Sequence, residues 1–185
     1  MNKVIAAINL TIDGYCDHTA GIPDQEIHHH YSELLKNAEV ILYGRKTYQL
    51  MQYWKTILKN PSEDKSMFEF AQAIDKIEKI VFSNTLKNLQ WESARFANYD
   101  LKQEVDELKR QKNGDILVGS PGLINSLTHL GLIDEYQLCI HPVVLGSGLA
   151  LFKNISEKLT FKLVRTKTFP NGAVILYYQP SLGEG

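Results

Sequence analysis

The stretch that decides the fold reads Asp115-Ile116-Leu117-Val118-Gly119-Ser120-Pro121-Gly122-Leu123-Ile124. A short apolar run ends in a Gly-Ser-Pro-Gly cluster, and apolar residues then return at helical spacing as far as Leu130. This pattern predicts a buried strand, a tight turn and a helix. Pro121 suits the first turn of that helix, where its missing N–H costs no hydrogen bond.

The turn between this strand and this helix is a candidate anion site. Gly119 and Gly122 carry no side chain, so a ligand can approach the backbone closely. The free N–H groups at a helix start, aided by the helix dipole, attract phosphate groups. The alternative is an ordinary strand-to-helix connection that uses glycine for tightness, because short glycine motifs often occur without a ligand.

The rest of the chain places this unit in a mixed sheet. Helix signals begin at the N-cap Asp24, and residues 52–66 have the composition of a loop. Asn171-Gly172 between two strand-like runs predicts a C-terminal hairpin. We expect an α/β fold with a mostly parallel sheet and antiparallel C-terminal strands, a single domain over residues 1–180 and a disordered tail over residues 181–185. Strands are predicted at residues 4–10, 39–43, 79–83, 94–97, 116–118, 135–144, 159–167 and 173–179, and helices at residues 24–37, 67–74, 101–111 and 121–131.

Three polar corners follow predicted parallel strands. In an open α/β sheet, ligands bind outside the carboxyl ends of such strands. Together the corners suit a long, multiply phosphorylated ligand such as a dinucleotide. The sequence contains no P-loop and no G-x-G-x-x-G pattern, so the usual Rossmann fingerprint is not supported. The corners are Gly44-Arg45-Lys46-Thr47, Ser83-Asn84-Thr85 and Gly119-Ser120-Pro121-Gly122.

Net charge, the length of apolar runs and the cysteine spacing limit the classes of partner that we expect for this protein. The 185 residues carry a net charge of -1, so nothing favours nucleic acid. No apolar run approaches the ~18 residues that span a bilayer, so we expect no membrane association. Cys16 and Cys139 lie far apart, which indicates a reducing cytoplasm rather than a disulfide framework. Adjacent helical positions point about 100° apart, so His28-His29-His30 does not predict a metal site.

Several motifs lie in one order along nearly the whole chain. They are Thr11-Ile12-Asp13-Gly14, Gly44 to Tyr48, Val81 to Thr85, Asp115 to Ser120, Gly131 to Tyr136, and His141 to Gly148 with Leu151-Phe152. In these residues the chain resembles the dihydrofolate-reductase-like superfamily. Within it, the chain is most similar to stand-alone relatives of the reductase domain of the bifunctional riboflavin-biosynthesis deaminase-reductase.

The resemblance implies a three-layer α/β/α dihydrofolate-reductase-like fold and a cytoplasmic homodimer. It also implies an NAD(P)H-dependent reductase that transfers hydride to a small molecule, pteridine-like or pyrimidine-like. The alternative is a non-catalytic protein of the same fold that binds a nucleotide, a pterin or a flavin. Many relatives carry an arginine where Asn84 stands, so NADH is an alternative to NADPH.

The resemblance further implies cofactor contacts at the strand ends. The residues are Ala7, Ile12 and Gly14 at the nicotinamide, Gly44, Arg45, Lys46 and Thr47 at phosphates, Ser83 and Asn84 near the adenosine 2'-phosphate, and Gly119, Ser120, Pro121, Gly122 and Leu123 around the pyrophosphate.

Candidate catalytic and substrate residues lie between the first strand and residue 54. True dihydrofolate reductases carry a carboxylate on the first helix, and by spacing that position falls at His28. We therefore expect no folate reduction. His28 is a candidate substrate contact or proton donor, and Asp13 is the other candidate catalytic residue. Tyr31, Tyr48 and Trp54 are candidate substrate contacts because pockets favour aromatics, although packing is the alternative for Tyr48 and Trp54.

Overall fold

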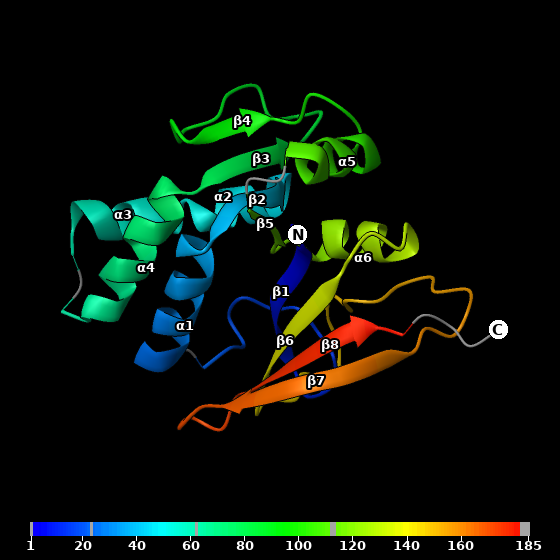
Figure 1. Ribbon diagram of the computed structural model, residues 1–185. Coiled ribbons are helices and arrows are strands. Elements are labelled where there is room, and N and C mark those ends of the chain that lie inside the picture. Colours follow the sequence, from blue (N-terminus) through cyan, green and yellow to red (C-terminus); the bar gives the residue numbers. More distant parts are fainter. Residues whose placement is uncertain (1, 23, 62, 112–113, 182–185) are drawn as a thin grey trace.

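The chain folds around one eight-stranded sheet whose strands come from both ends of the sequence (Figure 1). The computed structural model describes residues 2–22, 24–61, 63–111 and 114–181. The strand order across the sheet is β4-β3-β2-β5-β1-β6-β8-β7. The strands are β1 (Val4–Thr11), β2 (Ala38–Gly44), β3 (Glu78–Phe82), β4 (Ala94–Phe96), β5 (Asp115–Val118), β6 (Glu135–His141), β7 (Phe161–Thr168) and β8 (Val174–Pro180).

Strands β1 to β6 pair in parallel, and the C-terminal hairpin is antiparallel. β1 lies between β5 and β6, and β2 lies between β3 and β5. β8 pairs antiparallel with both β6 and β7. The predicted mixed sheet is therefore confirmed. Ala6 of β1 is 0% exposed, and its neighbour Ile5, which faces the opposite side of the sheet, is 5% exposed, as expected for a central strand that is covered on its two faces.

Helices cover both faces of the sheet, which gives the expected three layers. In Figure 1, α5 and α6 lie on one side of the strands, and α1, α3 and α4 lie on the other. Within the part of the chain that the structure describes, no helix combines the length and apolar character needed to cross a bilayer. The helices are α1 (Gln25–Lys36), α2 (Arg45–Met51), α3 (Tyr53–Lys59), α4 (Lys65–Lys76), α5 (Leu101–Gln111) and α6 (Pro121–His129).

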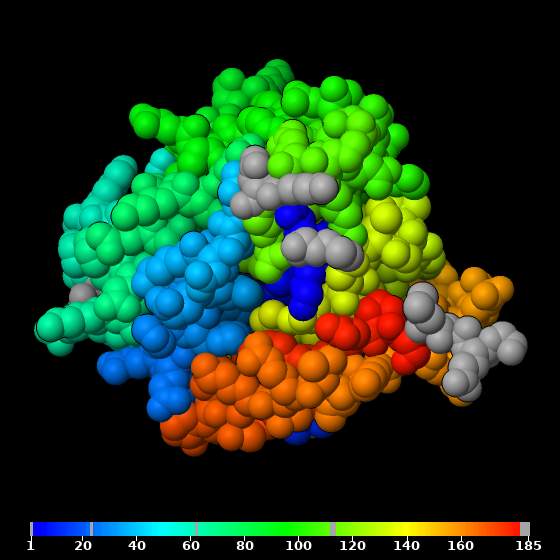
Figure 2. Space-filling model, in the orientation of Figure 1, coloured from blue at the N-terminus to red at the C-terminus, as the bar shows by residue number. Residues whose placement is uncertain are grey.

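Alternating residues of β1 divide the core between the two faces. Ala6 belongs to the cluster that includes Val105 of α5 and Leu127 of α6. Its neighbour Ile5 belongs to the cluster that includes Leu35 of α1. In the space-filling view, β1 shows between α1 and the hairpin of β7 and β8 (Figure 2). This strand is therefore the axis on which both layers of helices pack.

The segment between β2 and β3 differs from the sequence prediction. Residues 52–66 contain the helix α3 and the start of α4, so the prediction of a loop over this range is wrong. The N-cap residue of α3, Gln52, supplies no side-chain cap, so the usual start signal is missing. The helix is held instead by packing, since Ile57 is 8% exposed and Trp54 meets Phe70 of α4 edge to face with ring centroids 4.5 Å apart.

Two further local predictions are confirmed. Asp24 is the N-cap of α1, and its carboxylate accepts from the N–H of Ile27 at 2.9 Å. The C-terminal hairpin turns at Asn171-Gly172, where Gly172 adopts a φ of 86°, a conformation that favours glycine. The predicted tail lies outside the described residues except for Ser181, whose N–H donates to the Thr160 carbonyl at 2.9 Å.

The C-terminal end of α6 is tied to the loop after β6 through His129. Its Nδ1 lies 2.7 Å from the Asn125 carbonyl oxygen, and its Nε2 lies 3.0 Å from the Asn154 carbonyl oxygen. Carbonyl oxygens only accept, so the charged ring with two N–H donors fits best. The Asn125 carbonyl, followed by that of Asn154, accordingly raises the pKa of His129 above its ordinary value.

We expect this contact to make stability depend on pH. Because the pKa is raised in the folded state, the contribution is complete below the unfolded pKa of about 6.5 and is lost as pH rises through the folded value. Between about pH 6 and about pH 8, wild type should lose more thermal stability than the His129→Gln variant does. A melting temperature that changes equally in both proteins would contradict the assignment.

Candidate functional site

Strands β2 and β5 end side by side, and a hydrogen bond joins their ends. The two strands pair with Leu42 opposite Val118, so Gly44 and Ser120 lie at the same level. The backbone N–H of Gly44 donates to the Ser120 hydroxyl at 2.9 Å. Because Ser120 is only 3% exposed, water competes little for this bond. The bond therefore fixes the two strand ends against each other.

Helices α2 and α6 begin directly after these strand ends. Gly44 is the N-cap residue of α2 and Ser120 is that of α6, and neither supplies a side-chain cap to its helix. The first backbone N–H groups of the two helices therefore remain available to another partner. Since N–H groups and helix dipoles favour negative charge, the paired helix starts suit the phosphate groups of a ligand.

The start of α6 leaves room for such a ligand. A Cβ at Gly122 would meet no atom within 4 Å. One at Gly119 would lie 3.6 Å from a ring carbon of Tyr43 and 3.9 Å from the Ala7 carbonyl oxygen. Gly122 is thus open to a close approach, whereas Gly119 faces the protein at the level of β1.

The other two corners lie along the same edge. Arg45 and Lys46 are exposed at the start of α2, and Thr47 is partly buried behind them. β3 pairs with β2 so that Phe82 lies opposite Gly44, which brings the third corner next to the first. The three corners therefore lie along one edge of the sheet, as predicted.

The third corner is a short hydrogen-bonded turn. The Ser83 hydroxyl accepts from the N–H groups of Thr85 at 3.2 Å and Leu86 at 3.0 Å. Asn84 is exposed at the tip. Ser83 can still donate its own proton, so both side chains remain accessible to a ligand at this edge.

β1 ends beside β5, on the side of β5 opposite β2. Ile12 is 62% exposed, and its N–H donates to the Val143 carbonyl at 2.9 Å. Gly14 has a φ of 81°, and its N–H donates to the Thr11 carbonyl at 2.9 Å. The predicted turn after the first strand is therefore present.

The structure argues against Asp13 as a proton donor. Its carboxylate accepts from the Thr11 hydroxyl at 2.6 Å and from the N–H of Gly146 at 2.7 Å. These hydrogen bonds, with that from Thr11 largest, lower the pKa of Asp13. A carboxylate held in its ionised form by structural donors is a poor general acid. Asp13 fastens the turn after β1 to the loop after β6.

His28 and Trp54 are not at the end of β1 but between helices. The Nδ1 of His28 lies 3.2 Å from the Ser66 hydroxyl of α4. Its ring meets Trp54 edge to face with centroids 5.7 Å apart and also lies against Phe70. Burial lowers the pKa of His28, so the ring is neutral at ordinary pH. Both residues pack α1, α3 and α4 together, which corrects their assignment as substrate contacts.

Tyr48 packs in the protein interior, which is the alternative to substrate contact that the sequence left open for it. It is 0% exposed, and its hydroxyl accepts from the N–H of Gln90 at 2.7 Å. Its ring meets Trp91 edge to face at 5.5 Å. Tyr48 therefore anchors the segment before β4 to α2.

Tyr31 is the substrate candidate that does reach β1, and it meets two residues that the sequence analysis missed. Its hydroxyl donates to the Asn9 Oδ1 at 3.0 Å. The Nε2 of His141 lies 3.2 Å from the same oxygen. Asn9 could have been noticed, because it is a lone amide in the apolar run of β1 and is exposed there. His141 is 1% exposed on β6, beside the end of β1.

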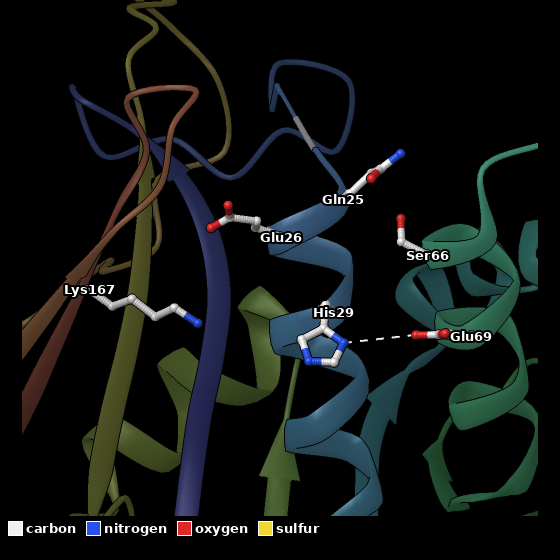
Figure 3. A pocket seen from close by; sticks show the side chains of 6 residues that line it. All are labelled: Gln25, Glu26, His29, Ser66, Glu69 and Lys167. Carbon is white, nitrogen blue, oxygen red and sulfur yellow. Dashed lines mark ion pairs between the residues drawn. The ribbon is translucent and has the colours of Figure 1, made fainter.

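A shallow hollow lies between α1 and α4, and Lys167 near the end of β7 also lines it (Figure 3). Figure 3 shows His29 and Glu69 facing each other across it, with His29 Nδ1 3.8 Å from Glu69 Oε2. The lining carries charges of both signs and none of the residues of the three corners, so we assign it no role in the site. In the ranges that the structure describes, no three His, Cys, Asp or Glu side chains are grouped to hold a metal ion. The residues that line the hollow are Gln25, Glu26, His29, Ser66, Glu69 and Lys167.

The sequence of this chain matches a known family, and its structure is similar to solved structures of other proteins. Residues 2–175 match the family model of the RibD C-terminal domain. The uncharacterized protein YyaP of Bacillus subtilis is 32% identical over 182 residues, or 95% of this chain and 94% of that protein. A candidate riboflavin biosynthesis protein from Shewanella sp. PV-4 has a similar structure, with a TM-score of 0.71, 17% identity, and 97% and 99% of the two chains covered. A pyrimidine reductase-like protein from Corynebacterium diphtheriae gives a TM-score of 0.68 at 16% identity, with 98% and 93% covered.

Proposed function

This chain belongs to the RibD C-terminal domain family, and on that basis we propose that it is a reductase that uses NADPH to reduce a small molecule. The observation that carries the proposal is the pair of helix starts after β2 and β5, joined by the bond from Gly44 to Ser120. Two helix starts, an open Gly122 and the cations Arg45 and Lys46 suit a pyrophosphate with a further phosphate.

The chain's own residues would hold and orient the cofactor. Gly119, Ser120, Pro121, Gly122 and Leu123 would surround the pyrophosphate, while Gly44 to Thr47 with Ser83 and Asn84 would meet the remaining phosphates. Ala7, Ile12 and Gly14 would border the nicotinamide. When bound, the reduced nicotinamide supplies a hydride to the substrate. The substrate would lie beside Tyr31, and a pteridine-like or pyrimidine-like ring is the class that we propose.

A second candidate function is binding without catalysis. It is favoured by Asp13, whose carboxylate is hydrogen-bonded within a turn, and by His28, whose ring is packed between helices, since neither is placed to donate a proton. Such a protein would bind the nucleotide, a pterin or a flavin in the same fold. The expected homodimer and cytoplasmic location remain predictions.

The test is ligand-induced stabilisation. A ligand that binds only the folded state raises the melting temperature by mass action, so NADPH should do so. If neither NADPH nor NADH at about millimolar concentration raises it, the reductase proposal fails. If NADPH binds but no pteridine, pyrimidine or small carbonyl compound causes absorbance loss at about 340 nm, the binding protein is the better description.

Arg45 provides a test of cofactor choice. We expect Arg45→Ala to weaken NADPH binding about 3- to 10-fold more than NADH binding, because a cation at α2 would meet the extra phosphate. Calorimetric titration of both cofactors measures the difference. Lys59→Ala, which removes an exposed cation from α3, is the matched control and should change neither affinity. Equal losses for the two cofactors in Arg45→Ala would place Arg45 at the pyrophosphate instead.

A further inference from the structure

Asn9 lies on β1 just beyond the level of the cofactor corner. β1 pairs with β5 so that Ala6 is opposite Val118, which sets Ala7 level with Gly119. Side chains alternate along a strand, so Asn9 projects on the same face as Ala7, one strand repeat further toward the carboxyl end. Its side chain is exposed. An amide at this position is therefore accessible to a small molecule that lies against Ala7.

The hydrogen bonds of His141 fix the orientation of this amide. The backbone N–H of Ile22 donates to the Nδ1 of His141 at 3.1 Å. A backbone N–H can only donate, so Nδ1 carries no proton and the neutral ring carries it on Nε2. Nε2 then donates to the Asn9 side-chain atom 3.2 Å away, which must be the oxygen. Burial lowers the pKa of His141, which keeps the ring neutral.

Tyr31 supplies a second donor to the same oxygen. Its hydroxyl lies 3.0 Å from the Asn9 Oδ1. Burial raises the pKa of Tyr31 well above its ordinary value, so the phenol keeps its proton. The oxygen of Asn9 thus accepts from two side chains, and the two hydrogens on Nδ2 are directed elsewhere. Among the described residues, none accepts a hydrogen bond from Nδ2.

We propose that the Asn9 amide is a specificity-determining contact that donates from Nδ2 to a carbonyl oxygen or imine nitrogen of the substrate, with Tyr31 and His141 as the residues that position it. The inference rests on the proposed function. Reduction of a C=O or C=N bond adds a hydride to carbon and a proton to oxygen or nitrogen, and water supplies the proton. A donor beside the oxygen or nitrogen stabilises the negative charge that develops there.

The contact predicts which ligands bind, and two matched probes test it. Acetophenone carries a carbonyl that only accepts, and benzamidinium carries N–H groups that only donate. Asn9→Asp is nearly the same shape and still accepts from Tyr31 and His141, but it replaces the outward donor with an acceptor. At about pH 8, where His141 is neutral, we expect acetophenone affinity to fall about tenfold in this variant and benzamidinium affinity to rise.

Nuclear magnetic resonance provides readouts that do not depend on activity. The nitrogen shifts of His141 should identify Nε2 as the protonated atom, and acetophenone should move the side-chain amide signals of Asn9. Tyr31→Phe removes one positioning bond and should weaken acetophenone severalfold while leaving NADPH affinity unchanged. Asn88→Asp, at an exposed loop asparagine, controls for the added charge and should behave as wild type.

The titrations are made with and without NADPH. The hydrogen bonds around Asn9 are made by residues of the chain itself, so binding of the probe at Asn9 does not require bound NADPH. The inference is overturned if acetophenone fails to move the Asn9 amide at its solubility limit. It is also overturned if Asn9→Asp leaves the preference between the probes unchanged, or if His141 carries its proton on Nδ1. Failure of NADPH to bind would contradict the proposed reductase but not this contact, so the two failures are distinguishable.

Discussion

The Gly122→Asp variant should bind NADPH at least about 30-fold more weakly than wild type while remaining as stable or more stable. A carboxylate in the first turn of α6 would occupy the space that Gly122 leaves open, where a Cβ meets no atom within 4 Å. Like charges placed together cost on the order of 2 kcal/mol or more, which gives the expected loss. The same carboxylate stabilises the helix start by about 0.3–1 kcal/mol.

Because NADPH affinity should fall while stability does not, the variant distinguishes loss of the binding site from damage to the fold. Gly122→Asn is the matched control, since it has the same size as the aspartate and no charge. It should lose much less affinity than Gly122→Asp does. Isothermal titration with NADPH and thermal unfolding without ligand measure the two quantities. Unchanged NADPH affinity in both variants would mean that the turn is only a connection between β5 and α6.

The alignment of the three corners along one edge of the sheet could be predicted because its signals are local. Each corner is a strand followed at once by small or polar residues, and parallel strands bring their carboxyl ends to one edge. The sequence 115–124 therefore predicted its own strand, turn and helix. What it could not predict is the bond from Gly44 to Ser120, which joins residues 76 positions apart.

The surroundings of the candidate substrate residues could not be predicted in the same way. Spacing along the chain led to the choice of His28, but the direction of a helical side chain depends on what packs beside the helix. α3 has no capping signal, so the surface formed by Trp54 and Phe70 was not foreseen, and His28 turns toward it. The contact between Asn9 and His141 spans 132 residues and arises only when β1 pairs with β6.

Glu104 should be among the most costly residues to remove from this fold. Its side chain is 3% exposed at the start of α5. One oxygen accepts from the N–H groups of Asn98 at 2.9 Å and Tyr99 at 3.1 Å, and the other lies 2.8 Å from the Arg95 guanidinium. Removing the carboxylate leaves the two backbone N–H groups without this acceptor, whereas Arg95, which is 36% exposed, keeps its ion pair with Glu78 at 2.9 Å. Since each buried donor left unsatisfied costs about 1–3 kcal/mol, we expect Glu104→Ala to lower the free energy of unfolding by about 2 kcal/mol or more.

The control lies on the same helix. Glu107 pairs with Arg110 at the surface, so Glu107→Ala should change the free energy of unfolding by no more than about 0.5 kcal/mol. Glu104→Gln should fall between the two, because its amide oxygen can still accept from the backbone while its NH2 group faces the Arg95 donors. Urea unfolding of the three variants gives the comparison. If Glu104→Ala cost no more than Glu107→Ala, the buried carboxylate would not be what fastens β4 to α5.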